Sequence, residues 1–215
     1  MSFKGDQSKV LIAPVGDPSG WVKATYQCKN YEESAMKSGY FSFVCENGHS
    51  EIILVVQDSI VFPTSISRDR NELYNNCKEH TPCYSGARID TYEQLVEMAE
   101  RYANCVFSEY KDKLKVIIVP SIGFFKDKCS DEKSVEMHSN AHPDIIRSLL
   151  TIKIYEELSR INSPSLTLDV DLTHGVNYLN QLVSQAVRDA ASVLSLSRQQ
   201  VKLNFYSAVP TVERN

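Results

Sequence analysis

Two short segments of the chain combine glycines, hydroxyl groups and a histidine, residue types that suit an anionic ligand. The segments are Gly16-Asp17-Pro18-Ser19-Gly20-Trp21 and Asp171-Leu172-Thr173-His174-Gly175-Val176-Asn177. Glycines let a backbone approach a ligand closely, and Ser19 and Thr173 supply hydroxyls. The second segment stands where a strand should give way to a helix, whose first N–H groups bind phosphate. It therefore predicts a phosphate contact that includes His174.

Each loop also has a purely structural interpretation. Asp-Pro-Ser-Gly is a common turn sequence, and Trp21 could pack on a sheet edge instead of a ligand. Thr173 could cap the helix while His174 bonds a neighbouring carbonyl. Neither loop is a dinucleotide or P-loop fingerprint, because G-x-G-x-x-G is absent and no Gly-Lys-Ser/Thr follows.

Metal ligands are poorly represented, and we expect neither a metal nor a cofactor. Asp169 and Asp171 fall on one face of a strand, but with one histidine they lack a further ligand. His138 and His142 have helical metal-pair spacing, yet Pro143 should begin the next helix and leave both in a loop.

The two loops need a scaffold, which five apolar runs provide as predicted strands. Runs that are apolar at consecutive positions are typical of parallel strands covered on both faces. The runs are residues 10–14, 52–56, 116–119, 166–170 and 201–205. The loops follow the first and fourth runs, and ligands bind beyond the carboxyl ends of such strands.

Apolar positions recur at helical spacing between the strands. Three helices are predicted, over residues 91–108, 143–159 and 175–196. Asp90 is the expected N-cap of the first, and Pro143 suits the first turn of the second. Strands alternating with helices predict an α/β fold, a mainly parallel sheet with helices on both faces.

Two segments fit this alternation less well. Residues 23–40 predict a hairpin after the first strand, and a packing helix is expected to begin within residues 38–46. Residues 62–88 are polar and irregular, with a short helix near residues 70–78, and form either a lid, a partner contact or solvated surface.

Composition limits the function classes. With 215 residues, 42% hydrophobic and 23% charged, the chain suits one ordinary globular domain. A net charge of -4 argues against direct binding to double-stranded nucleic acid, though not against a local pocket for a small anion. No apolar run approaches membrane-spanning length and no signal peptide is evident, so no membrane contact and a cytoplasmic location are expected.

The six cysteines contain no C-x-x-C pair, which argues against a zinc ribbon and a thioredoxin site. They are expected to be buried or free thiols. Alternatively, Cys77 pairs with Cys83, or Cys28 with Cys45, if the source is a hyperthermophile.

Together, the two loops resemble the CARF domain of type III CRISPR ancillary proteins, and in particular the CARF–HEPN ribonucleases. The string from Asp171 to Tyr178, D-L-T-H-G-V-N-Y, is the more specific element, and the Gly16-Asp17-Pro18-Ser19 loop supports it. The strand ending in Pro120-Ser121-Ile122-Gly123-Phe124 and the last strand, ending in Asn204-Phe205-Tyr206-Ser207, are also similar. The likeness covers nearly the whole chain, as a single CARF-like domain over residues 1–215.

The resemblance implies a Rossmann-like homodimer whose interface binds cyclic oligoadenylate, most often cyclic tetra-adenylate. The implied ligand-binding residues are those of the two loops, namely Gly16, Asp17, Pro18, Ser19, Gly20, Trp21, Thr173, His174, Gly175 and Asn177. Valine at Gly175 is expected to block backbone approach and weaken binding without unfolding the protein.

Three functions remain open from the sequence. The chain is a sensor domain, or a ring nuclease that cleaves cyclic tetra-adenylate by metal-independent 2′-OH attack, or an unrelated nucleotide-binding α/β regulator. In the second case Thr173, His174 and Ser19 are the candidate catalytic residues. The HEPN motif is an arginine, four to six residues and a histidine; none of the five histidines fits it, so no HEPN domain is expected here.

Overall fold

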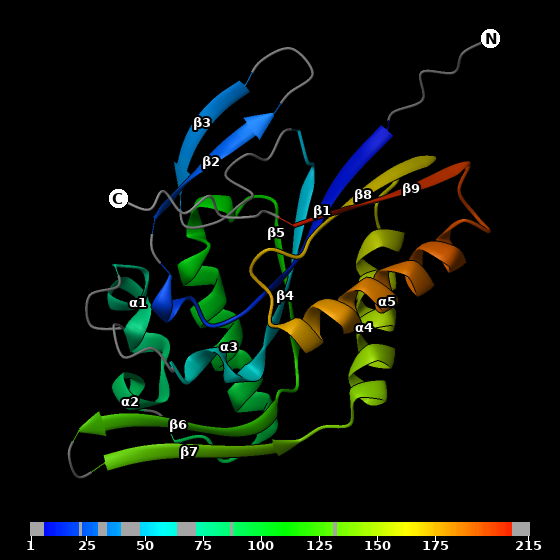
Figure 1. Ribbon diagram of the computed structural model, residues 1–215. Helices are drawn as coiled ribbons and strands as arrows, with labels where there is room; N and C mark the ends of the chain where they lie inside the picture. The colour runs from blue at the N-terminus through cyan, green and yellow to red at the C-terminus, as the bar shows by residue number, and fades with distance from the viewer. Residues whose placement is uncertain are drawn as a thin grey trace.

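A parallel sheet of five strands, in the order β5-β4-β1-β8-β9, forms the centre of the computed structural model (Figure 1). The structure describes residues 7–21, 23–29, 34–39, 48–63, 72–86, 88–130 and 133–207. The five strands are β1 (Gln7–Val15), β4 (Glu51–Gln57), β5 (Leu114–Val119), β8 (Ser165–Asp171) and β9 (Gln200–Tyr206). Each contains one of the five predicted apolar runs, so the predicted strands are confirmed.

Helices cover both faces of this sheet, as the apolar runs require. One face packs against α4 (Pro143–Ser159) and α5 (Asn177–Leu194), and the other against α3 (Tyr92–Val106) and the short α1 (Glu72–Cys77). Residues 52–56 of β4 have no exposed surface, because their side chains alternate between the two covered faces. The predicted fold class is therefore confirmed.

The three long helices match their predictions apart from one cap. The N-cap of α3 is Thr91, not Asp90: Thr91 Oγ1 accepts the Gln94 N–H at 3.3 Å, and Gln94 Oε1 accepts the Thr91 N–H at 3.2 Å. This reciprocal capping box satisfies two donors at once, which Asp90 paired with Glu93 does not do. Pro143 begins α4 as predicted. No helix in the described ranges is long and apolar enough to cross a membrane.

The segment after β1 contains the predicted hairpin. Its strands are β2 (Ala24–Lys29) and β3 (Ser34–Gly39), paired antiparallel. The expected helix start at Ser38 is wrong, because Ser38 lies in β3 opposite Thr25. Residues 40–46 of that expectation lie outside the described residues.

The polar segment 62–88 contains short helical pieces. They are α1, the 3-10 turn Lys78–His80 and α2 (Pro82–Ser85). The predicted helix near residues 70–78 corresponds to α1.

A second hairpin was not predicted. Strands β6 (Ile122–Ser130) and β7 (Lys133–Asn140) pair antiparallel and lie across the end of the molecule at which the sheet strands end (Figure 1). Its sequence alternates: Phe124 is exposed, whereas Asp127 is fully buried and Phe125 packs on the core. His138 lies in β7 and His142 caps α4, so the two histidines do not share a helix.

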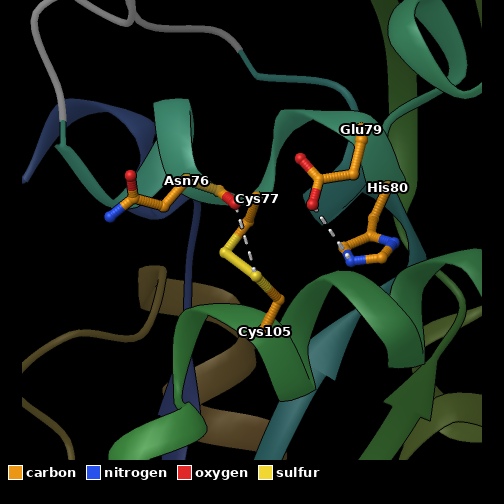
Figure 2. The surroundings of a disulfide bond; sticks show 5 residues. All are labelled: Asn76, Cys77, Glu79, His80 and Cys105. Atoms are coloured by element: carbon orange, nitrogen blue, oxygen red, sulfur yellow. Dashed lines mark hydrogen bonds and ion pairs between the residues drawn. A yellow bond between two sulfur atoms is a disulfide. The ribbon is translucent and has the colours of Figure 1, made fainter.

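A disulfide links α1 to α3, joining Cys77 to Cys105 (Figure 2). The Cα atoms are 5.8 Å apart and 28 residues separate the cysteines along the chain. The expected pairing of Cys77 with Cys83 is wrong, because packing of α1 on α3 brings Cys105 to Cys77. The alternative of Cys28 with Cys45 involves Cys45, which lies outside the described residues.

Candidate functional site

The strand order places the two predicted loops next to each other. The chain passes from β1 outward through β4 to β5, then returns to the other side of β1 to form β8 and β9. The carboxyl ends of β1 and β8 therefore flank the point at which the winding reverses. Ligands of open α/β sheets bind at this switch point.

The two loops are bonded to each other at this edge. The Gly16 N–H donates to the His174 carbonyl oxygen at 2.9 Å. The rings of Trp21 and His174 pack with their centroids 4.6 Å apart and their planes tilted by 40°. Trp21 thus packs on the second loop, not on a bare sheet edge, and Gly16 and Trp21 of the first loop meet the second loop at His174.

Both loops use the same Asp-x-Ser/Thr turn. Asp17 accepts the Ser19 N–H at 2.8 Å and the Ser19 hydroxyl at 2.7 Å. Asp171 Oδ1 likewise accepts the Thr173 N–H at 2.9 Å and the Thr173 hydroxyl. Each hydroxyl proton is therefore donated within its own turn, and Ser19 is fully buried. These turns set the shape of the two loops. Hydrogen-bond donors for an anion therefore have to come from other groups of the loops.

One source of such donors is the start of α5. Its N-cap is Val176, which makes no side-chain capping bond, and Asn177 is exposed as the first helical residue. The first N–H groups of a helix have no intrahelical partner and carry the positive end of its dipole. This end of α5 can bind a phosphate without a basic side chain.

Gly175 was predicted to allow close approach of the backbone to a ligand. In the structure, packing beneath the loop also leaves no space for a side chain at this position. A Cβ built on Gly175 would overlap Asn180 Oδ1 and lie 2.9 Å from Pro14 Cβ. Valine at this position would therefore displace packed groups beneath the loop. This crowding argues against the expectation that Gly175→Val leaves the fold intact. Gly16 is less crowded, because a Cβ there would lie 3.4 Å from its nearest neighbour, the His174 carbonyl oxygen.

A small hollow of about 140 Å³, partly open to solvent, lies beside the first loop. Its wall combines the ends of β1 and β4 with one residue from the β6–β7 hairpin and one from the start of α5. The lining residues are Val15, Gly16, Asp17, Gln57, Ser59, Ile60, Phe62, Phe125 and Val176. Apolar walls with a few polar groups are typical of small-molecule sites.

Six of these lining residues lie outside the two predicted loops. Gln57 ends β4, and Ser59 and Phe62 follow it, where the rule applied to β1 and β8 would have located them. Phe125 gave no such signal, because its hairpin was not predicted.

Polar groups support the β4 side of the hollow. Gln57 Nε2 donates to the Tyr178 hydroxyl, which links the end of β4 to the first turn of α5. Asp58 is buried and accepts the Ser121 N–H at 2.9 Å, which ties the end of β4 to the turn after β5. Burial raises the pKa of Asp58, although its hydrogen bonds oppose that effect.

His174 is the titratable group at the junction of the loops. Burial lowers the pKa of its imidazole below the ordinary value, and the nearby Asp171 carboxylate opposes that shift only in part. The lowered pKa favours the neutral ring at pH 7, which carries one N–H donor and one acceptor nitrogen.

Asp169 belongs to a separate polar cluster on the same face of β8 as Asp171. Its carboxylate accepts from Lys9 Nζ at 2.8 Å, His49 Nε2 at 2.8 Å and Asn204 Nδ2 at 2.7 Å. Burial raises its pKa, but the hydrogen bonds from Asn204, Lys9 and His49 outweigh burial and hold the pKa below its usual range. Among the residues described, no three metal-ligating side chains gather into a site.

The fold and the arrangement of its loops define a Rossmann-like α/β domain. The family model for the CARF domain of the CRISPR system endoribonuclease Csx1 matches residues 10–210, and the chain belongs to this family. It is thus a CARF domain of a type III CRISPR ancillary protein. This sets aside the alternative of an unrelated nucleotide-binding regulator.

A curated relative agrees. The chain is 25% identical over 208 residues to a CRISPR system endoribonuclease Csx1 from Methanocaldococcus jannaschii. The match covers 96% of this chain but only 38% of the relative. The chain therefore spans well under half the length of the relative it matches.

Proposed function

We propose that this CARF domain is a sensor in type III CRISPR antiviral signalling that binds cyclic oligoadenylate, with cyclic tetra-adenylate the favoured ring. The observation that carries the proposal is the junction of the two switch-point loops at His174, directly before the uncapped start of α5. Family membership supplies the signalling context.

The chemistry of the site suits this ligand. Each phosphate can be met by the first N–H groups of α5 and by the neutral His174 ring, so a chain of net charge -4 can bind an anion locally. An adenine can enter the hollow beside Gly16, where Phe62 and Phe125 offer aromatic surface and Gln57 a polar group.

We further propose that two copies share one ring. A cyclic tetranucleotide has alternating phosphates, and a two-fold dimer presents the same loops to each half of it. Under this arrangement the ligand contacts come from Gly16, Asp17 and Trp21 of the first loop and from His174 and Asn177 of the second. Ser19, Thr173 and Gly175 act through the shapes of their turns.

Isothermal titration calorimetry with cyclic tri-, tetra- and hexa-adenylate tests the proposal. We expect heat of binding with cyclic tetra-adenylate above all, and no comparable heat with linear tetra-adenylate as the matched control. Absence of binding to all three rings would contradict the proposed function.

A ring nuclease activity is a second candidate, favoured by the neutral His174 ring beside Thr173. A neutral imidazole can accept the proton of a ribose 2′-OH as that oxygen attacks its own phosphodiester. Chromatography for linear di-adenylate products separates this activity from binding alone. Product formed by the wild type but not by His174→Ala would support it.

A further inference from the structure

One side chain beneath the second loop bonds to both of the loop's ends. Asn180, in the first turns of α5, donates through Nδ2 to the carbonyl oxygen of Leu172 at 2.9 Å and to that of Gly175 at 3.3 Å. The amide nitrogen has two hydrogens, one for each carbonyl. Asn180 therefore spans the loop from the residue after β8 to the residue after His174.

The Asn180 amide lies where a side chain on Gly175 would otherwise be. The position of a Cβ on Gly175 is occupied by Asn180 Oδ1, and Asn180 Cγ lies 2.9 Å from it. Oδ1 is buried and finds no donor among the described residues. A hydrocarbon side chain would avoid that unsatisfied acceptor, so the two donated bonds are what the amide contributes.

Two residues, Thr173 and His174, lie between those two bonds, and His174 is the one that joins the two loops. Its carbonyl accepts the Gly16 N–H and its ring packs on Trp21, so its position decides how the two loops meet. We infer that Asn180 is a positioning residue, which holds the β8–α5 loop in the shape that places His174 against Trp21. Its effect on ligand affinity rests on the proposed function, whereas its effect on the ligand-free loop does not.

The ligand-free arm of the test uses Trp21, the single tryptophan of the chain, as a fluorescent reporter. A protonated imidazole quenches a neighbouring indole, so the emission follows both the ring contact and the titration of His174. In the wild type we expect a midpoint below about 6.5, because burial lowers the pKa of His174.

Asn180→Ala should shift the emission spectrum and move the midpoint toward about 6.5, as His174 becomes more exposed. Asn180→Leu keeps the branched shape without the donors, and it serves where the alanine variant folds poorly. Gln181→Ala is the matched control, an exposed side chain one residue further along the same helix. Wild-type emission and midpoint in both Asn180 variants would overturn the inference.

The ligand arm uses calorimetry with cyclic tetra-adenylate on the same variants. We expect about a tenfold loss of affinity in Asn180→Ala, since two neutral hydrogen bonds no longer fix the loop, and no loss in Gln181→Ala. Altered emission with unchanged affinity would support the positioning of His174 and count against the proposed ligand site. If the wild type binds no cyclic oligoadenylate, only the proposed function is contradicted. The fluorescence measurement on the ligand-free protein still decides the role of Asn180.

Discussion

His174 is the residue at which structural and ligand roles are hardest to separate, because its carbonyl joins the loops and its ring faces Trp21. Only the ring is lost in His174→Ala. We expect a loss in affinity for cyclic tetra-adenylate of ~1–3 kcal/mol, about five- to 150-fold, with little change in melting temperature.

Melting and calorimetry on the same sample check this, with His80→Ala as a matched control outside both loops. A His174→Ala variant that melts early but binds like the wild type would remove the second loop from the ligand site.

Two buried aspartates at the residue scale should respond to pH in opposite senses. The raised pKa of Asp58 means that the folded protein favours its neutral form; that contribution to stability is present below pH 3.8 and lost as the pH rises through the raised pKa. Asp58→Asn should therefore match or exceed the wild-type melting temperature at pH 7, with its advantage growing between pH 4 and pH 7. The amide can still accept the Ser121 N–H.

Asp169→Asn is the contrasting variant. The lowered pKa of Asp169 contributes stability above pH 3.8, which is lost as the pH falls through the folded pKa. Losing the charge opposite Lys9 and His49 should cost ~2 kcal/mol at pH 7. Thermal melts of both variants from pH 3 to pH 8 provide the check, and the same pH trend in both would contradict it.

At the scale of elements, the five sheet strands and three long helices could be predicted because burial on both faces leaves unbroken apolar runs. The β6–β7 hairpin could not, because its exposed face mixes the apolar Ile122 and Phe124 with polar residues, and its inner face packs against α2 and the core. The candidate loops could be predicted from glycines and hydroxyls at strand ends. The role of Asn180 could not be predicted. Its bonds to Leu172 and Gly175 form only because the first turn of α5 lies beneath the loop that precedes the helix.

The disulfide is an element-scale constraint, because it fastens α1 to α3 across 28 residues of sequence. Closing a loop of this size in the unfolded chain stabilises the fold by roughly 3–4 kcal/mol. The Cys77→Ala/Cys105→Ala double variant should melt about 10 °C lower. Differential scanning calorimetry of both proteins, with the reduced wild type alongside, measures this; an unchanged melting temperature would show that α1 is held by packing alone.

At the scale of the whole molecule, the proposed dimer requires an apolar surface at the carboxyl edge of the sheet. Ile145 in the first turn of α4 is 65% exposed and Phe124 of the hairpin is 61% exposed. A partner that covers both side chains would remove their apolar surface from water. We expect size-exclusion chromatography with light scattering to show a dimer, and titration calorimetry to give one cyclic tetra-adenylate for every two chains.

Ile145→Glu places a charge on that surface and should shift the protein toward monomer. Affinity should fall with it, because half of the proposed site then comes from a subunit no longer in place. Leu196→Glu is the matched control: Leu196 is 87% exposed but follows the far end of α5, away from the carboxyl edge of the sheet. Two results would contradict the shared site: one cyclic tetra-adenylate bound by each chain, or full affinity in a monomeric Ile145→Glu variant. Either would mean that each domain binds the ligand without its partner.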